Sequence, residues 1–245
     1  MTAIRVNHLR KEYKNVIAVD DLSLEIEQGE LFALLGVNGA GKTTTVKMLA
    51  TLVKPTSGDA ELLGHSVLTE ANKVKEVIDI SMQETAVARK LTVAENLAFY
   101  SRLSGQPEAE RQRVMREVCD AFGLDAVKGR QAGKLSGGWQ RKLSIALALV
   151  SQPKILFLDE PTLGLDVLAR RELWQTIESL KGKVTIVLTT HYMEEAEALA
   201  DRIGVMQDGR LRFVGTKEAL FAETGKPSVE DAFIELVSKG GDRHA

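Results

Sequence analysis

Gly36-Val37-Asn38-Gly39-Ala40-Gly41-Lys42-Thr43 decides the fold of this chain, because it matches the pattern G-x-x-x-x-G-K-[ST]. A continuous apolar run, Leu31–Leu35, precedes it, and a helix-like segment, Thr44–Leu52, follows it. In such a strand–loop–helix arrangement, glycines let the backbone curl so that its N–H groups point at phosphate oxygens near the helix start. The stretch therefore predicts a phosphate-binding loop in an α/β protein.

Two side chains of this loop have predicted roles of their own. Lys42 would reach the β- and γ-phosphates of a nucleotide, and the Thr43 hydroxyl would bind Mg²⁺. We expect nucleotide contacts from the following residues: Gly36, Asn38, Gly39, Gly41, Lys42, Thr43 and Thr44. By itself the loop indicates only a P-loop nucleotide-hydrolysing enzyme, and a glycine-rich turn that matches by chance is the simpler alternative.

A pair of adjacent carboxylates follows another apolar run, Ile155–Leu158. Ligands of open α/β sheets bind at the carboxyl ends of the strands, which is where Asp159 and Glu160 fall. We expect Asp159 to hold Mg²⁺ and Glu160 to orient or deprotonate the attacking water. In isolation, an Asp-Glu pair before Pro161 would have a simpler explanation, as a capping pair at a turn.

Apolar patterning elsewhere predicts the architecture. Continuous apolar runs, such as Ile78–Met82 and Val184–Leu188, favour parallel strands buried on both faces. Alternation in the first segment, up to Ile26, favours an antiparallel sheet. We expect one domain over residues 1–245: a P-loop core with a mostly parallel sheet, an N-terminal antiparallel β subdomain, an inserted helical subdomain at about 87–150, and a C-terminal helical tail at 216–245. The last residues, Gly240–Ala245, are expected to be disordered.

Composition narrows the function classes. The chain has 245 residues, 44% of them hydrophobic and 27% charged, and a net charge of −2. The balanced charge gives no reason to expect nucleic acid as a partner. A single cysteine, Cys119, excludes an internal disulfide framework. No signal peptide and no apolar run long enough to cross a bilayer are found, so we expect a soluble, cytoplasmic protein.

The segment Leu135-Ser136-Gly137-Gly138-Trp139-Gln140 resembles the signature of the ABC ATPases, which is Leu-Ser-Gly-Gly followed most often by Gln. We call Leu135–Gly138 the signature segment. The resemblance implies that Ser136, Gly137 and Gly138 form a second anion site, which faces the γ-phosphate of ATP held by another subunit. Two ATP molecules would then lie between two chains in a head-to-tail dimer. Trp139 departs from the usual pattern, and its role stays open.

Other landmarks of the family occur along the chain in the order that the family has, and the resemblance covers Ile4–Val214. The resemblance implies that Gln83 contacts Mg²⁺, that Asp166 in Gly164-Leu165-Asp166 senses the other subunit, and that His191 contacts the γ-phosphate. It also implies that Tyr13 stacks on adenine. As isolated residues, each has a plainer explanation in packing or surface exposure. A P-loop kinase or GTPase would not explain Ser136–Gly138 together with His191.

The resemblance further implies an ATPase subunit, peripheral to the cytoplasmic face of the membrane, that drives export through a separate permease. The permease would contact Glu84–Leu103, although an ordinary helical cap is the plainer interpretation of that segment. The run His191–Arg202 is similar to bacterial drug and antibiotic exporters. The second subunit could be a copy of this chain or a paralogous ATPase. The alternative is a soluble, non-transport ABC ATPase acting in translation or DNA repair, against which the single set of motifs and the lack of a heptad run count.

Overall fold

A computed structural model describes the backbone of residues 1–241 and the side chains of residues 1–238. Its strands are β1 (Thr2–Tyr13), β2 (Val16–Glu27), β3 (Leu31–Leu35), β4 (Ser57–Leu62), β5 (His65–Ser66), β6 (Ile78–Ser81), β7 (Ile155–Asp159), β8 (Thr185–Thr190), β9 (Arg202–Gln207) and β10 (Arg210–Gly215). Its helices are α1 (Lys42–Leu49), α2 (Ala71–Val77), α3 (Val93–Leu103), α4 (Glu108–Phe122), α5 (Gly137–Leu149), α6 (Val167–Glu178), α7 (Met193–Leu199), α8 (Lys217–Thr224) and α9 (Val229–Gly241).

The larger sheet of the described residues has six strands in the order β10-β9-β3-β8-β7-β6. All of its pairs are parallel except β9 with β10. Alternate residues of its central strands pack into two different hydrophobic cores. In β3, Leu31, Ala33 and Leu35 pack in one core, and Phe32 and Leu34 pack in the other. Both faces are therefore buried, which explains why these strands are continuous apolar runs.

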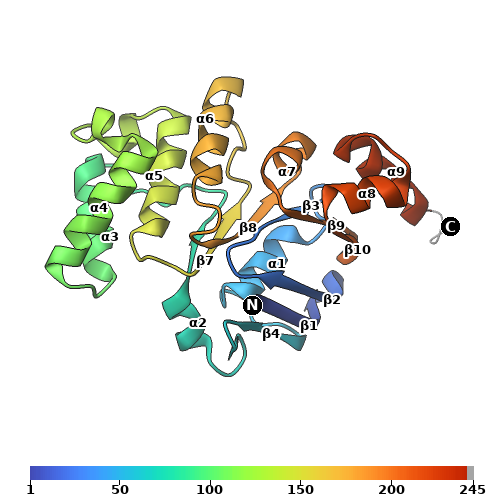
Figure 1. The fold of residues 1–245 in the computed structure, drawn as a ribbon. Helices are drawn as coiled ribbons and strands as arrows, with labels where there is room; N and C mark the ends of the chain where they lie inside the picture. Colours follow the sequence, from blue (N-terminus) through green and yellow to red (C-terminus); the bar gives the residue numbers. More distant parts are fainter. Residues whose placement is uncertain (242–245) are drawn as a thin grey trace.

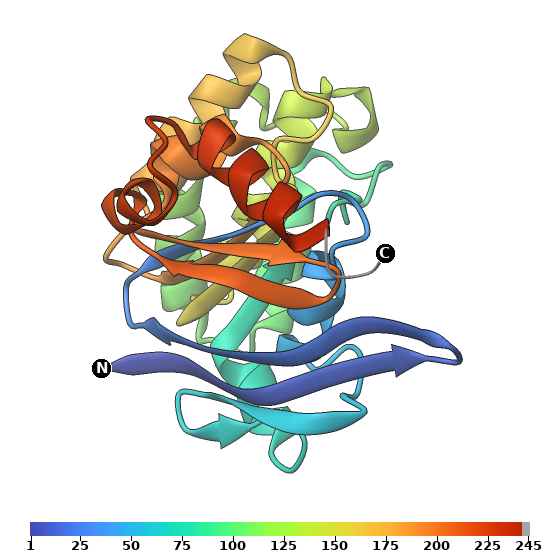
Figure 2. The ribbon, with the colours of Figure 1, turned by 90° about the vertical axis from the view of Figure 1, so that its right-hand side faces the viewer.

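The smaller sheet is antiparallel, with four strands in the order β2-β1-β4-β5. Its longest pair alternates as predicted: in β1, Ile4 and Val6 are buried while Arg5 and Asn7 face outward. The inward side chains join Phe32 and Leu34 of the larger sheet in one core. Figure 2 shows this sheet below the larger one. The predicted combination of a mostly parallel core with an N-terminal antiparallel sheet is confirmed.

Between β6 and β7 the described chain forms helices without a named strand, together with two short 3₁₀ turns at Leu124–Val127 and Ala132–Lys134. Figure 1 shows α3, α4 and α5 gathered on the side of the molecule opposite to α8 and α9. Helix α3 begins with a capping box, in which Thr92 and Glu95 each bond to the other's backbone N–H. This helical region carries the signature segment at the start of α5.

The C-terminal helix α9 packs onto its own domain. Val229, Ala232 and Phe233 are buried in the core that also contains β3 and α7, and Leu236 and Val237 pack against that core. Helix α9 extends to Gly241, so the predicted disorder is wrong for Gly240 and Gly241, while residues 242–245 lie outside the described residues. Within residues 1–241, no helix has both the length and the apolar character needed to cross a membrane.

Candidate nucleotide-binding site

The strand register brings four segments together at one edge of the six-stranded sheet. Leu35, the last residue of β3, pairs with Thr190 of β8, and Asp159 of β7 pairs with Thr189. On the other side of β7, Ser81 pairs with Leu158. The segments that follow these strands therefore emerge side by side, although they come from separate parts of the sequence. They begin at Gly36, Met82, Glu160 and His191.

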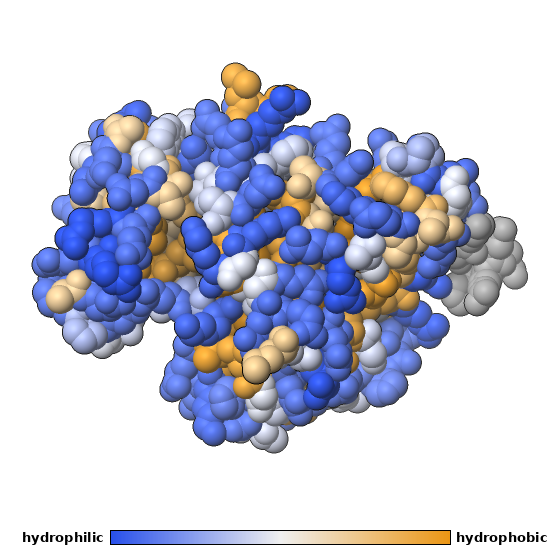
Figure 3. All heavy atoms as spheres, in the orientation of Figure 1, coloured by the Kyte–Doolittle hydropathy of each residue, from blue (hydrophilic) through white to orange (hydrophobic). Residues whose placement is uncertain are grey.

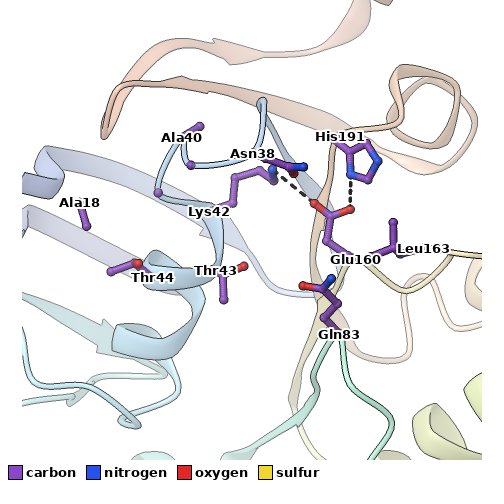
Figure 4. Close-up of a pocket in the computed structure, with 12 residues that line it drawn as sticks. Ala18, Asn38, Ala40, Lys42, Thr43, Thr44, Gln83, Glu160, Leu163 and His191 are labelled. Carbon is purple, nitrogen blue, oxygen red and sulfur yellow. Dashed lines mark hydrogen bonds and ion pairs between the residues drawn. The ribbon is translucent and has the colours of Figure 1, made fainter.

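These segments surround a pocket of about 350 Å³. Its lining consists of Ala18, Asn38, Gly39, Ala40, Gly41, Lys42, Thr43, Thr44, Gln83, Glu160, Leu163 and His191. Figure 4 shows Lys42 and His191 converging on Glu160 from opposite sides, with Gln83 below them. Of the pocket-lining residues, the sequence analysis missed Ala18 and Leu163, which have no motif signal, and Ala40, a variable position of the loop.

The loop conformation depends on glycine at Gly41. This residue has φ = 104°, in the region that L side chains rarely adopt, and a Cβ there would lie 2.3 Å from the Ala18 carbonyl oxygen. Helix α1 starts at the next residue, Lys42. The first N–H groups of a helix have no partner within it, so the loop and helix start together present donors suited to an anion.

Lys42, Glu160 and His191 form one cluster, in which Lys42 and Glu160 are buried and His191 is partly buried. The Lys42 ammonium lies 3.3 Å from Glu160 Oε1, and His191 Nδ1 lies 2.5 Å from Glu160 Oε2. Lys42 also donates to the Gly36 carbonyl oxygen at 2.7 Å. The Lys42 and Glu160 side chains are only 5% and 7% exposed. Because Lys42 and Glu160 are buried, their opposite charges interact more strongly than they would on the surface.

Glu160 has a left-handed backbone, with φ = 50°. Such a conformation costs about 1–2 kcal/mol for a residue with a Cβ. The Glu160 N–H donates to the Thr189 carbonyl oxygen at 3.0 Å, which helps to hold the turn. The strained backbone directs the carboxylate into the pocket, and such strain is often found at functional sites.

Asp159 is fully buried and only half satisfied. Its Oδ1 atom accepts hydrogen bonds from Thr189 at 2.5 Å and Thr43 at 3.0 Å, whereas its Oδ2 atom is buried without a partner. An unpaired buried carboxylate oxygen beside a hydroxyl suits a hard cation such as Mg²⁺. The described residues contain no cluster of three or more His, Cys, Asp and Glu side chains that could hold a metal.

Arg141 is a residue that the sequence analysis did not identify. Its guanidinium, 3% exposed, donates to the carbonyl oxygens of Met82 at 2.6 Å, Gln83 at 2.8 Å and Glu160 at 3.0 Å. Burial lowers the pKa of Arg141, and the nearby carboxylates, chiefly Asp159, oppose that shift. The sequence signal that could have identified Arg141 is a basic residue three positions after Gly138, at the start of a helix whose side chains are otherwise largely buried.

The signature segment does not reach this pocket. Ser136 is the N-cap of α5, but its hydroxyl makes no capping hydrogen bond, and Ser136 and Gly137 are exposed. Asp166 likewise does not line the pocket; its carboxylate caps α6 by accepting from the N–H groups of Leu168 and Ala169, both at 3.0 Å. The two segments are neighbours, since the Cβ that Gly138 lacks would lie 3.1 Å from Ala169.

Tyr13, expected to stack on adenine, is the last residue of β1 and does not line the pocket. It is 43% exposed, and Lys11 lies over its ring at 4.9 Å from the centroid. Its adenine contact stays a prediction.

Comparisons with known proteins identify the family and relatives of this chain. A family model described as ABC transporter matches residues 19–163. The probable multidrug ABC transporter ATP-binding protein YbhF of Escherichia coli is 38% identical over all of this chain, which spans 43% of YbhF. The daunorubicin/doxorubicin resistance ATP-binding protein DrrA of Streptomyces peucetius is 41% identical over 91% of this chain and 68% of DrrA.

Among solved structures, an ATP-binding subunit of an ABC transporter superposes with a TM-score of 0.86 at 27% identity, over 96% of this chain and 99% of the other. This likeness covers both sheets and the helical region, so it extends well beyond the phosphate-binding loop. On the matched family model, the similar relatives and the fold, the chain belongs to the ABC transporter family, as an ATP-binding protein of that family.

Proposed function

We propose that this chain hydrolyses ATP in a head-to-tail dimer and thereby drives export through a separate membrane permease. The observation that carries the proposal is the pocket lined by Lys42, Glu160 and His191, with Asp159 bonded to Thr43 of its lining. Ser136 and Gly137 remain exposed outside this pocket. One chain thus offers a phosphate site and, elsewhere, a second anion site that a neighbouring chain's nucleotide could use.

In this proposal, each residue of the pocket has one task. The loop N–H groups and Lys42 bind the phosphates, and Glu160 accepts a proton from the attacking water, with His191 holding its carboxylate in place. Asp159 and Thr43 would hold Mg²⁺, with Gln83 at the edge of the same pocket. When bound, Mg²⁺ neutralises the charge that develops on the phosphate oxygens.

The second chain is proposed to be another copy or a paralogous ATPase. Its support is the surface beside the signature segment, where α6 begins with Val167 and Leu168, 64% and 74% exposed. Figure 3 shows apolar atoms that protrude where Figure 1 draws one end of α6. Exposed apolar side chains of this size favour a protein contact.

The permease contact is proposed for Glu84–Leu103, which places this chain at the cytoplasmic face of a membrane. Phe99 and Leu103 of α3 are 51% and 68% exposed. Beside them, α3 and α4 line a largely apolar hollow of about 460 Å³, to which Leu97 and Met115 contribute. The names of YbhF and DrrA, which refer to drugs, support export as the direction of transport. They favour this proposal over a role in translation or DNA repair.

Replacing Glu160 by Gln tests the proposed reaction. Gln keeps the shape of the side chain but cannot take a proton, so we expect turnover to fall about 10²–10⁴-fold. The ATP-bound variant should accumulate as a dimer in light scattering with ATP and Mg²⁺. Glu178→Gln, the same change on the exposed end of α6, is the matched control. An unchanged rate in Glu160→Gln would exclude this carboxylate as the base.

A further inference from the structure

Arg141 joins the two parts of the molecule that the proposed function keeps separate. It lies in α5, the helix that the signature segment begins, five residues after Ser136. Its guanidinium, however, lies at the edge of the nucleotide pocket, where it donates to carbonyl oxygens of three residues. They are Met82, Gln83 and Glu160.

These carbonyl oxygens come from two strand ends. Met82 and Gln83 follow β6, while Glu160 follows β7, and the two strands pair in parallel. Gln83 and Glu160 both line the pocket, so their backbone positions set where their side chains point (Figure 4). Arg141 therefore fixes two functional segments relative to each other and to α5.

The chemistry of the guanidinium suits this task. Its planar, rigid fork of N–H donors can serve several acceptors at once, and it accepts no hydrogen bond itself. A lysine at this position would offer a single mobile ammonium, and a glutamine only two N–H groups. The three hydrogen bonds that the Arg141 guanidinium donates go to backbone carbonyls, and its positive charge strengthens each of them.

We propose that Arg141 is a positioning residue that couples the signature helix α5 to Gln83 and Glu160 of the same chain. The inference rests on the proposed function. A nucleotide that contacts Ser136 from a second chain would shift α5, and Arg141 would carry that movement to the pocket of its own chain. Loss of Arg141 should therefore disturb the reaction step more than nucleotide binding.

Kinetics of Arg141→Gln and Arg141→Lys test the proposal, with Arg113→Gln as the matched control. Arg113 lies in α4 of the same helical region, is 47% exposed and forms ion pairs with Glu110 and Glu117. We expect kcat to fall about ten- to a hundredfold in Arg141→Gln, with KM and nucleotide affinity within about twofold of wild type. Arg141→Lys should keep an intermediate kcat.

The melting temperature of each variant is measured in parallel, since Arg141 is buried. If Arg141→Gln does not fold, a lower kcat of folded Arg141→Lys at wild-type KM still supports the proposal. A folded Arg141→Gln or Arg141→Lys with wild-type kcat overturns it, as does a loss of nucleotide affinity equal to the loss of kcat. Failure of the proposed function is distinguishable, because wild type itself would then neither hydrolyse ATP nor dimerise.

Discussion

The phosphate-binding loop, Gly36–Thr43, and the signature segment, Leu135–Gly138, are both glycine-containing sequences at the start of a helix, yet their surroundings differ. The loop meets Glu160 and His191, which directly follow β7 and β8, and Lys42 is buried beside Glu160. The signature segment meets none of these groups, and Ser136 and Gly137 are exposed. Under the proposed function, the difference means that a single chain assembles one half of a nucleotide site and presents the other half outward.

Lys42→Ala changes the phosphate-binding loop, and we expect it to have the largest effect on turnover. The variant removes both a phosphate ligand and the buried cation that faces Glu160, so we expect turnover to fall about 10²–10³-fold, together with a loss of nucleotide affinity. Turnover and equilibrium binding of a fluorescent ATP analogue measure the two effects. Lys75→Ala, on the exposed face of α2, is the control. If Lys42→Ala binds and hydrolyses ATP like wild type, the pocket is not the phosphate site.

Ser136→Ala changes the exposed signature segment. We expect it to have a smaller effect than Lys42→Ala and to weaken ATP-dependent dimerisation. Since Ser136 is exposed and caps nothing with its hydroxyl, the fold and the affinity of one chain for nucleotide should not change. A lost hydrogen bond to a charged phosphate is equivalent to about ten- to a hundredfold in dimer affinity. The measurement is ATP-dependent dimerisation in the Glu160→Gln background, by analytical ultracentrifugation.

Two results would contradict this second prediction. One is ATP-dependent dimerisation that is equally strong with and without the Ser136 hydroxyl. The other is a loss of nucleotide affinity in the separate chain, because the signature segment would then belong to the same site as Lys42.

Glu195→Gln should have the smallest effect of the three, and that effect should be on the pH dependence of the stability of the fold. Glu195 belongs to the buried core close to the pocket. Glu195 lies in α7, shortly after His191; it is fully buried and accepts a hydrogen bond from Trp174 Nε1 at 3.0 Å. Burial raises the pKa of the Glu195 carboxyl, and hydrogen bonding, including that from Trp174, opposes part of the rise. The folded protein therefore binds a proton that the unfolded chain has already released, and stability falls as pH rises through the raised pKa.

Because Gln is neutral at every pH, the melting temperature of Glu195→Gln should lie a few degrees above that of wild type at pH 8. At pH 5 the two melting temperatures should be nearly equal. Thermal unfolding at both pH values checks the sign. Glu197→Gln, the same change at an exposed position of α7, should show no such trend. A difference that does not vary with pH would argue against a buried protonated carboxyl.

Much of the fold could be predicted because the strands of the larger sheet are buried on both faces. Such burial leaves continuous apolar runs, and the predicted strand Ile78–Met82 differs from β6 by one residue. Strand β9 was missed because Gly204 interrupts its pattern. That glycine is required by packing, since a Cβ there would lie 2.7 Å from the Phe32 ring. Strand β4 was missed because Gly58 and Asp59 are poor strand formers.

By itself, the sequence determined the chemistry that the proposed function assigns to the site. The phosphate-binding loop, the Asp159–Glu160 pair and His191 are recognisable because binding phosphate and activating water would require these residue types in this order. Only the tertiary structure decided which groups meet. Strand register places Glu160 between Lys42 and His191, and the packing of α5 brings Arg141 to Gln83 and Glu160. Such contacts join residues far apart in the chain, and their hydrogen bonds go to backbone carbonyls, which every residue has and which therefore leave no pattern in the sequence.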